Sequence, residues 1–353
     1  MAKTNAARVL SLTDAEAVYV TRDYLKRYLT GFSIEDGYVI ADREGVTMYT
    51  DARYMEAAES FFSGRPGFSV KEMGGTNKPA VLLKRYRSVG IPFALTSYPD
   101  FRELEKLNVC LKDVMPAFVA CMEIKTEEEL ASVSCACDIA EDGFLRLLPT
   151  IREGQQEREV AARLEYEMRM AGSECTSFDT IVAFGEGAAV PHHETGSRRL
   201  RFGDEILIDF GCKVNGYCSD ITRTFLFGDD GKHQRFKEIY ADVLAAHLLF
   251  AEKFTAGMTG REGDAIARDC LAAKGWGKYF THSLGHGIGL NIHEEPRVSP
   301  SNGTIFQNGM VFSDEPGVYL AGELGVRIED TVYLCNGRVQ TFMKKTDKNL
   351  VII

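Results

Sequence analysis

The sequence predicts an α+β protein with two domains, of which the second is built by internal duplication. Three observations lead to this prediction. The chain has 353 residues, which is long enough for two separate hydrophobic cores. Strand and helix patterns alternate over the first third of the chain, whereas the remainder reads as two helices and a hairpin, twice over. We therefore expect a smaller α/β domain at residues 1–121 and a duplicated domain at residues 122–353.

The N-terminal domain is predicted from short strand patterns separated by helical patterns. Arg43-Glu-Gly45 is a hairpin signal between strand patterns at residues 38–42 and 46–49. Further strands are expected at residues 69–72, 88–95 and 109–114, and helices at residues 52–61, 79–85 and 99–107. The sequence has no ligand-like spacing of histidine and acidic residues in this region. We expect this domain to shape a site or an oligomer without carrying out chemistry.

The C-terminal domain is predicted to begin with a capped helix. Thr126 and Glu129 have the spacing of a capping box, and the helical pattern that they open continues to about Leu148. Further helices are expected at residues 156–171, 233–256 and 262–273, and a strand at residues 178–183. This order places one helical pair before each of two hairpins.

The first hairpin is the strongest local signal in the chain. Two runs rich in β-branched and aromatic residues flank Asn215-Gly216, and both of these residues can adopt the positive φ that a tight turn requires. With this pair as the loop, Asp209 faces Thr222, and Asp209 and Asp220 become diagonal neighbours about 7 Å apart. Carboxylates at that range repel each other, which predicts a cation between them. The alternative is an ordinary solvated aspartate on each strand.

The same pattern recurs near the C-terminus. Glu315-Pro-Gly stands where the first copy has Asp209-Phe-Gly, and Glu329-Asp-Thr331 stands where it has Asp220-Ile-Thr222. Repetition of a strand, an acid, a turn and a second acid indicates an internal duplication. The two hairpins together would present four acids to one point.

The histidines add a candidate fifth ligand. Five of the seven lie in two short segments that we expect to be loops, namely His192 and His193, then His282, His286 and His293. Glycines at positions 285, 287 and 289 surround His286, so that backbone and imidazole could approach a ligand closely.

Charge balance indicates two metal ions. Four carboxylates carry four negative charges, which two divalent ions balance, whereas one ion would leave two buried charges at a cost of several kcal/mol each. Oxygen ligands with a single imidazole favour Mn²⁺ or Co²⁺, with Fe²⁺ and Zn²⁺ as alternatives. Two ions roughly 3.5 to 4 Å apart can share a hydroxide, lower its pKa and polarise a carbonyl.

Charge and cysteine usage exclude other classes of protein. The net charge of −10 argues against nucleic acid or an anionic membrane as the partner. The nine cysteines are scattered without a metal-binding spacing, which favours reduced thiols in a cytoplasmic protein. No apolar run follows Met1, so neither a signal peptide nor a membrane span is expected.

At these residues the chain resembles the pita-bread metallopeptidases, the group of methionine aminopeptidase, aminopeptidase P, prolidase and creatinase. The matching segments are Ser177-Phe-Asp-Thr-Ile-Val-Ala183 with Pro191-His192, Asp209-Phe-Gly, Ser219-Asp-Ile-Thr-Arg-Thr224, His286-Gly-Ile-Gly-Leu-Asn-Ile-His293, Glu315-Pro-Gly-Val-Tyr319 and Gly325-Val-Arg-Ile-Glu-Asp-Thr331. The first 120 residues are similar to a creatinase-type N-terminal domain, which methionine aminopeptidases lack. The resemblance therefore implies a pita-bread fold for residues 122–353 and favours the Xaa-Pro aminopeptidase and prolidase branch.

The resemblance also implies roles for individual residues. Asp209 would bind one metal ion, and Asp220 and Glu329 would bridge both ions. His286 and Glu315 would hold the second ion. The histidines that match those lining the substrate site of the family are His192, His282 and His293.

Our hypothesis for the reaction is hydrolysis of the bond between an N-terminal residue and proline. A hydroxide that bridges the metals would attack the carbonyl, and Glu315 would accept a proton. His293 or His192 would stabilise the oxyanion or donate to the leaving nitrogen, whereas His282 would shape the proline pocket. Arg297 either binds a substrate carboxylate, which would favour dipeptides over longer peptides, or is an ordinary surface arginine.

The chain departs from the family pattern in three places, although none of them is a predicted metal ligand. They are Phe184-Gly-Glu186, Met122 in place of an arginine, and Asp314 in place of an aliphatic residue. Two alternatives to a peptidase stay open, namely a non-catalytic peptide-binding member of the fold and a creatinase-like amidinohydrolase. Similar proteins also lead us to expect a homodimer with the N-terminal domain as a contact.

Overall fold

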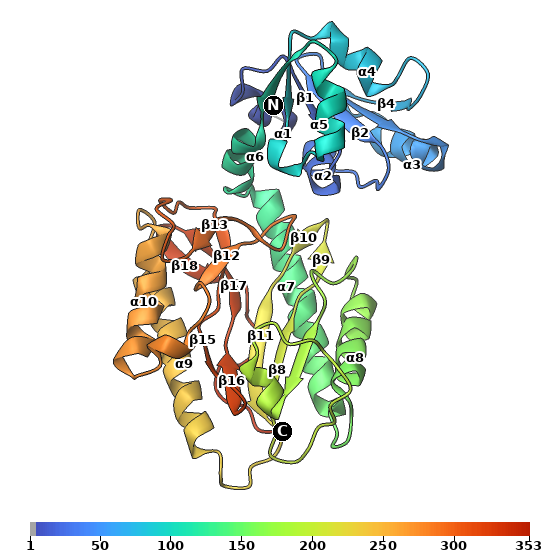
Figure 1. The fold of residues 1–353 in the computed structure, drawn as a ribbon. Coiled ribbons are helices and arrows are strands. Elements are labelled where there is room, and N and C mark those ends of the chain that lie inside the picture. The colour runs from blue at the N-terminus through green and yellow to red at the C-terminus, as the bar shows by residue number, and fades with distance from the viewer. Residues whose placement is uncertain (1–4) are drawn as a thin grey trace. The chain divides into compact units, whose positions relative to one another are not determined.

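The computed structural model describes residues 5–353, which form two compact units (Figure 1). The first unit ends at Met122 and the second begins at Glu123. No helix in the described range is both long and apolar enough to cross a membrane.

The N-terminal unit is built on a six-stranded mixed sheet with the order β4-β3-β2-β1-β5-β6. Its strands are β1 (Ala17–Val20), β2 (Tyr38–Asp42), β3 (Val46–Thr50), β4 (Phe68–Glu72), β5 (Ser88–Ile91) and β6 (Cys110–Asp113). Its helices are α1 (Asn5–Ser11), α2 (Asp23–Thr30), α3 (Ala52–Phe62), α4 (Pro79–Leu82), α5 (Tyr98–Glu105) and α6 (Met115–Met122). The predicted strand at residues 88–95 was too long, because Pro92 lacks the N–H needed for sheet pairing and a 3₁₀ turn follows at Phe93–Leu95.

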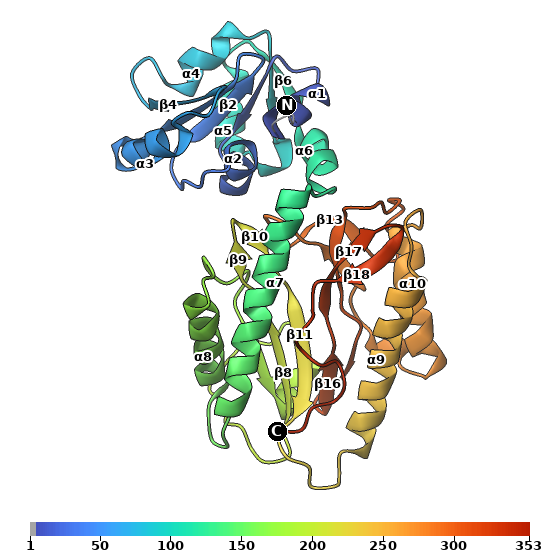
Figure 2. The ribbon, with the colours of Figure 1, turned by 180° about the vertical axis from the view of Figure 1, so that it is seen from behind.

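The first half of the C-terminal unit packs two helices on a three-stranded sheet. These helices are α7 (Glu127–Leu147) and α8 (Glu157–Met170), and the sheet has the order β11-β8-β7. Its strands are β7 (Ile181–Phe184), β8 (Glu205–Phe210) and β11 (Ile221–Leu226). The capping box is confirmed, because Thr126 accepts a hydrogen bond from the Glu129 amide while the Glu129 side chain accepts one from the Thr126 amide. Helix α7 lies along this sheet in Figure 2, and one apolar core joins the helices to the strands.

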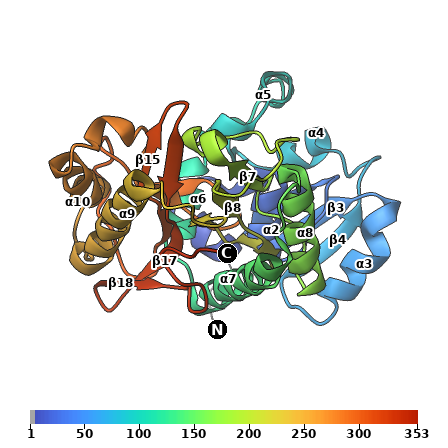
Figure 3. The same ribbon diagram turned by 90° about the horizontal axis from the view of Figure 1, so that it is seen from below.

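The second half repeats this plan. Helices α9 (Gln234–Lys253) and α10 (Gly260–Ala273) pack on a five-stranded sheet with the order β13-β12-β14-β17-β18. Its strands are β12 (Gly285–Gly287), β13 (Glu294–Val298), β14 (Val311–Asp314), β17 (Asp330–Cys335) and β18 (Arg338–Thr341). The predicted order of two helices and a hairpin, repeated once, is confirmed. Figure 3 shows the two helical pairs on opposite sides of the central strands.

The first hairpin has the predicted register. Asp209 pairs with Thr222 between β8 and β11, and Val214 pairs with Tyr217 between the short strands β9 (Lys213–Val214) and β10 (Tyr217–Cys218). Asn215 has φ +50° and Gly216 has φ +80°, as the predicted turn requires.

The second hairpin brings its two acids directly opposite each other. Asp314 pairs with Asp330 between β14 and β17. Gly317 pairs with Arg327 in the same register between β15 (Gly317–Leu320) and β16 (Leu324–Arg327). Glu315 therefore lies opposite Glu329, in the short interval between the two paired segments.

One prediction about the second histidine segment was wrong. His286 lies in strand β12, between β13 and β14, and not in a loop. A Cβ atom at Gly285 would lie 2.0 Å from the Ser313 carbonyl oxygen, and one at Gly287 would lie 2.4 Å from the Glu295 carbonyl oxygen. These glycines therefore admit neighbouring strands, which the sequence pattern could not distinguish from room for a ligand.

Candidate active site

A cavity of about 720 Å³ lies in the C-terminal unit, and every predicted site residue lines it. Strand β7 begins at Ile181, three residues later than predicted, and residues 178–180 line the cavity instead. The nine predicted residues on its wall are His192, Asp209, Asp220, His282, His286, His293, Arg297, Glu315 and Glu329. Side chains that are up to 137 positions apart in sequence, from His192 to Glu329, thus share one site.

The metal-donor residues form a tight, buried group. Asp220, His286 and Glu329 each offer a ligand atom within 4.8 Å of the others. His286 Nε2 lies 3.5 Å from Asp220 Oδ2 and 3.5 Å from Glu315 Oε1. Asp209 completes the set, and its Oδ1 atom is buried without a hydrogen-bond partner among residues 5–353.

Each hairpin holds the acid of the other through a threonine. The Thr222 hydroxyl donates to Glu329 Oε2 at 2.6 Å. The Thr331 hydroxyl accepts from the Asp220 amide at 2.9 Å and donates to the Asp220 carbonyl oxygen at 2.7 Å. The two contacts are related by the duplication, since both threonines occupy the same position in their hairpins. They fix the two halves of the acid cluster to each other.

The electrostatics of the cluster favour a bound cation. Burial, followed by the carboxylates of neighbouring residues, raises the pKa values of Asp220 and Glu329 well above the ordinary range. Burial raises the pKa of Glu315 to about 8 against the opposing effect of Arg327, and Asp209 adds to the increase. Four acids in one buried cluster cannot all ionise without a compensating positive charge.

His286 is prepared to act as a neutral ligand. Burial, with His293 as the next cause, lowers its pKa to about 3. Its Nδ1 atom lies 3.1 Å from the Gly287 carbonyl oxygen, which can only accept, so Nδ1 carries the hydrogen and Nε2 keeps its lone pair. Ser313 accepts from the His286 amide and donates to Glu315 Oε1, which orients both ligands. Four carboxylates, one of which has an unpartnered oxygen, together with one neutral imidazole fit a pair of divalent cations.

Sequence reasoning assigned no role to Arg327 or Tyr319, although both lie beside the donors. The buried Arg327 donates to Asp209 Oδ2 at 2.6 Å, to the Tyr319 hydroxyl at 2.9 Å and to the Thr222 hydroxyl at 3.0 Å. Sequence spacing could have identified Arg327 as a site residue. It is two residues before Glu329 and therefore lies on the same side of an extended chain.

The substrate-side histidines differ in their surroundings. His282 Nδ1 lies 2.8 Å from the Ser283 carbonyl oxygen and its Nε2 lies 2.9 Å from the Tyr319 hydroxyl, so both ring nitrogens are engaged. The His293 ring packs edge-on against His286, with 4.3 Å between ring centroids. Arg297 lines the cavity, although its side chain is 52% exposed and lies 3.8 Å from Glu295.

The loop that carries His192 is closed by a buried acid at the start of α8. Glu157 accepts hydrogen bonds from the amides of Phe184 and Gly196, on either side of this loop. His193 Nε2 lies 3.0 Å from Glu157 Oε2, which anchors the residue next to His192.

Two family models match the chain. Metallopeptidase family M24 matches residues 131–335, and the creatinase/prolidase N-terminal domain matches residues 5–121. The chain is 36% identical over 345 residues to a Xaa-Pro dipeptidase of Pyrococcus furiosus, with 95% of each chain covered. Among solved structures, a Xaa-Pro dipeptidase from Bacillus anthracis aligns with a TM-score of 0.92 at 33% identity over 99% of both chains. An X-Pro aminopeptidase from Thermotoga maritima aligns with a TM-score of 0.89 at 31% identity over 98% of this chain and 100% of the other.

These matches confirm the resemblance and the pita-bread fold with its creatinase-type N-terminal domain. They also show a metallopeptidase family, which implies divalent metal ions. The chain is therefore a member of metallopeptidase family M24 that carries a creatinase/prolidase N-terminal domain.

Proposed function

We propose that this protein is a dinuclear metallo-exopeptidase that cleaves the bond between an N-terminal residue and proline. The observation that carries the proposal is the buried group of Asp220, His286 and Glu329 with Glu315 and Asp209 beside it, in one cavity. Relatives that are named Xaa-Pro dipeptidases and match nearly the full chain support the choice of substrate. The complete donor set argues against a non-catalytic binding protein.

The donors divide naturally between two ions. In this proposal Asp209 holds one ion, His286 and Glu315 hold the other, and Asp220 and Glu329 bridge both. The oxygen-rich set favours Mn²⁺ or Co²⁺, with Fe²⁺ and Zn²⁺ as alternatives. Two bound ions would supply an activated water and a Lewis acid for the scissile carbonyl.

The remaining steps fall to side chains of the cavity. The Glu315 carboxylate would accept the proton of the attacking water. His293 or His192 would donate a hydrogen bond to the oxyanion or a proton to the leaving nitrogen. His282 would shape the proline pocket, because both of its ring nitrogens already have partners.

In this proposal Arg297 determines whether dipeptides or longer peptides are the better substrates. Its half-exposed side chain at the cavity could pair with a free substrate carboxylate. In a longer peptide the corresponding carbonyl is part of an amide and carries no charge. We therefore propose that dipeptides are the preferred substrates.

The test is an activity assay after metal exchange. Chelated protein would be reloaded with Mn²⁺ or Co²⁺ and given Xaa-Pro dipeptides and longer Xaa-Pro peptides, with matched peptides that lack proline as the control. We expect cleavage only at Xaa-Pro bonds, and faster cleavage of dipeptides. Inactivity on both substrate classes with every metal would rule the proposal out.

We further propose a cytoplasmic homodimer. No disulfide joins the cysteines within residues 5–353, which is typical of a reducing compartment. In this proposal the N-terminal unit supplies a subunit contact. Light scattering after size-exclusion chromatography would test this, and a mass near the 39.2 kDa of one chain would exclude the dimer.

A further inference from the structure

The second hairpin carries another pair of acids next to the metal donors. Asp314 precedes Glu315, Asp330 follows Glu329, and the two aspartates are directly paired between β14 and β17. Both are fully buried, with 0% of their surface exposed. Neighbouring residues of an extended chain point to opposite sides, so this pair lies away from the metal donors. Like charges directly opposite each other are destabilising, and these two require a cation of their own.

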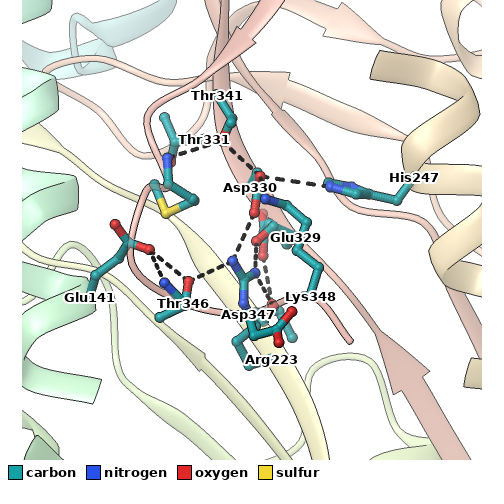
Figure 4. Close-up of polar contacts among 12 residues, drawn as sticks. Glu141, Arg223, His247, Glu329, Asp330, Thr331, Thr341, Thr346, Asp347 and Lys348 are labelled. Atoms are coloured by element: carbon teal, nitrogen blue, oxygen red, sulfur yellow. Dashed lines mark hydrogen bonds and ion pairs between the residues drawn. The ribbon is translucent and has the colours of Figure 1, made fainter. Parts of the chain in front are cut away.

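Asp330 is well compensated within the protein. Arg223 Nη2 lies 2.9 Å from Oδ1 and Lys348 Nζ lies 2.9 Å from Oδ2, while the Thr341 hydroxyl donates to Oδ2 at 2.7 Å (Figure 4). Although burial opposes ionisation, Arg223 and then His247 hold the pKa of Asp330 below its usual range.

Asp314 has much weaker support. Neither of its carboxylate oxygens has a hydrogen-bond partner in the part of the chain that the structure describes. Its one ion pair there is with His247, whose Nδ1 atom lies 3.0 Å from Asp314 Oδ2 without the alignment of a hydrogen bond. Because a buried carboxylate without a partner is costly, the stability of Asp314 depends on this imidazole.

His247 connects both aspartates to helix α9. Its Nε2 atom lies 3.7 Å from Asp330 Oδ2, and only 2% of the side chain is exposed (Figure 4). Burial opposes protonation, but Asp314 and Asp330 raise its pKa to about 9. The charged groups that surround it are Asp314 on β14, Asp330 on β17, Lys348 in the C-terminal segment and, beyond Asp330, Arg223 on β11. The imidazolium thus holds two strands and a helix together.

The first hairpin has no acid at either of the corresponding positions. By the alignment of the two copies, Ile208 stands where the second copy has Asp314, and Ile221 stands where it has Asp330. Both isoleucines are fully buried in the first apolar core. The first copy therefore has apolar side chains at these two positions, with the buried Arg223 paired to Ile208, whereas the second copy has two acids that contact a histidine.

We propose that His247 is a positioning residue of the metal centre, which fixes the separation of Glu315 and Glu329 by bridging Asp314 and Asp330. The inference rests on the proposed function, because it assumes that Glu315 and Glu329 bind metal. Without His247, Asp314 and Asp330 would repel each other. Because Asp314 is bonded to Glu315 and Asp330 to Glu329, this repulsion would move the two metal ligands apart. Loss of a group that contacts a metal ligand directly typically weakens metal binding about 10- to 100-fold, and because His247 acts one residue further away we expect a loss at the lower end of this range.

The test is a calorimetric titration of the metal-free, full-length protein with Mn²⁺. His247→Leu should bind the weaker Mn²⁺ ion about 10-fold less tightly than the unaltered protein. His247→Gln, which keeps a polar group without the charge, should be weakened in the same direction and serves if the leucine variant does not fold. The matched control is Val243→Ala, which alters a buried residue one turn earlier on α9 and should lower the melting temperature while leaving Mn²⁺ affinity unchanged.

A double variant tests the physical cause. Asp314→Val combined with His247→Leu removes the unsupported acid together with its partner and imitates the first hairpin, so Mn²⁺ affinity should return to within about threefold of the original. If the double variant binds Mn²⁺ as weakly as His247→Leu does, repulsion between the aspartates is not the cause. The proposal would also be overturned if Val243→Ala weakened Mn²⁺ binding as much as His247→Leu. Normal Mn²⁺ binding by His247→Leu would overturn only the role of His247. Absence of Mn²⁺ binding in the unaltered protein would instead overturn the proposed function and this inference with it.

Discussion

Asp220 is a site residue whose position is locally destabilising. Its carboxylate is buried beside Glu329, Asp209 and Glu315, all of which raise its pKa. Its backbone is nevertheless held firmly, since both its amide and its carbonyl contact the Thr331 hydroxyl. A firmly held backbone, together with a carboxylate that neighbouring acids repel, is the arrangement expected of a metal ligand.

Replacing Asp220 should lower activity while raising the stability of the metal-free protein. Asp220→Asn keeps the shape of the side chain but removes one of the charges that the metals require. Turnover should fall more than about 100-fold, since loss of an outer partner alone costs about 10- to 100-fold. The metal-free variant should melt at a higher temperature than the metal-free original at pH 8, because one repulsive charge has gone. An active variant that still binds two Mn²⁺ ions would remove Asp220 from the bridge.

Arg297 should control preference for substrate length. Arg297→Met removes the charge and keeps most of the hydrocarbon, so KM for Xaa-Pro dipeptides should rise about 10- to 100-fold, as expected for loss of a charged hydrogen bond. KM for tripeptides should stay unchanged. Arg235→Met, at an exposed ion pair with Glu323, is the control. An unchanged KM for dipeptides would assign Arg297 to the surface, and equal increases for dipeptides and tripeptides would contradict its role in the choice of substrate length.

At the scale of elements, hydrogen bonds between the two hairpins hold the site together. Thr222 and Thr331 each reach the acid of the opposite hairpin. Thr331→Val keeps the volume but removes both hydrogen bonds to Asp220, which should lower the free energy of unfolding by about 1 to 3 kcal/mol. The effect would be measured by denaturant unfolding. The control is Thr47→Val, which removes one solvent-exposed hydrogen bond to Ser69. A change below about 0.5 kcal/mol would show that other contacts hold Asp220 in place.

The sequence predicted those elements whose signals are local. The turn at Asn215-Gly216 determined the register of the first hairpin, and the capping box at Thr126 determined the start of α7, because neighbouring residues suffice for both. Repetition of the acid pattern then led to the second hairpin. Together with the histidine segments and the family resemblance, these signals led to nine of the residues that line the cavity.

What the sequence did not reveal depends on distant contacts. Strand β12 was mistaken for a loop, because only the approach of Ser313 and Glu295 explains its glycines. The contacts of Arg327 with Asp209 and Thr222 join residues more than 100 positions apart. The bridge from His247 to Asp314 likewise joins a helix to a strand that is distant in sequence.

At the scale of the whole molecule, the metal-free protein should lose stability as the pH rises. The folded-state pKa of Glu315 is raised to about 8 and that of His247 to about 9. A raised pKa means that the folded state favours the protonated group, so the contribution is complete below the unfolded pKa and is lost as the pH rises through the folded value. The melting temperature of chelated protein should therefore fall between pH 5.5 and pH 9.

Metal should reverse most of this loss. Mn²⁺ binds the ionised carboxylates and competes with protons, so it should raise the melting temperature more at pH 8 than at pH 5.5. Scanning calorimetry with and without Mn²⁺ at both pH values measures the difference, and NaCl at equal ionic strength serves as the control. A larger effect of Mn²⁺ at pH 5.5 would contradict the raised acid pKa values.

The central claim is that four acids and one histidine from two related hairpins hold a pair of divalent ions. Anomalous diffraction at the manganese absorption edge, from crystals grown with Mn²⁺, tests it most directly. We predict two peaks per chain, both of them enclosed by Asp209, Asp220, His286, Glu315 and Glu329. A map with its manganese peaks outside this group, or with none in the cavity, would contradict the account.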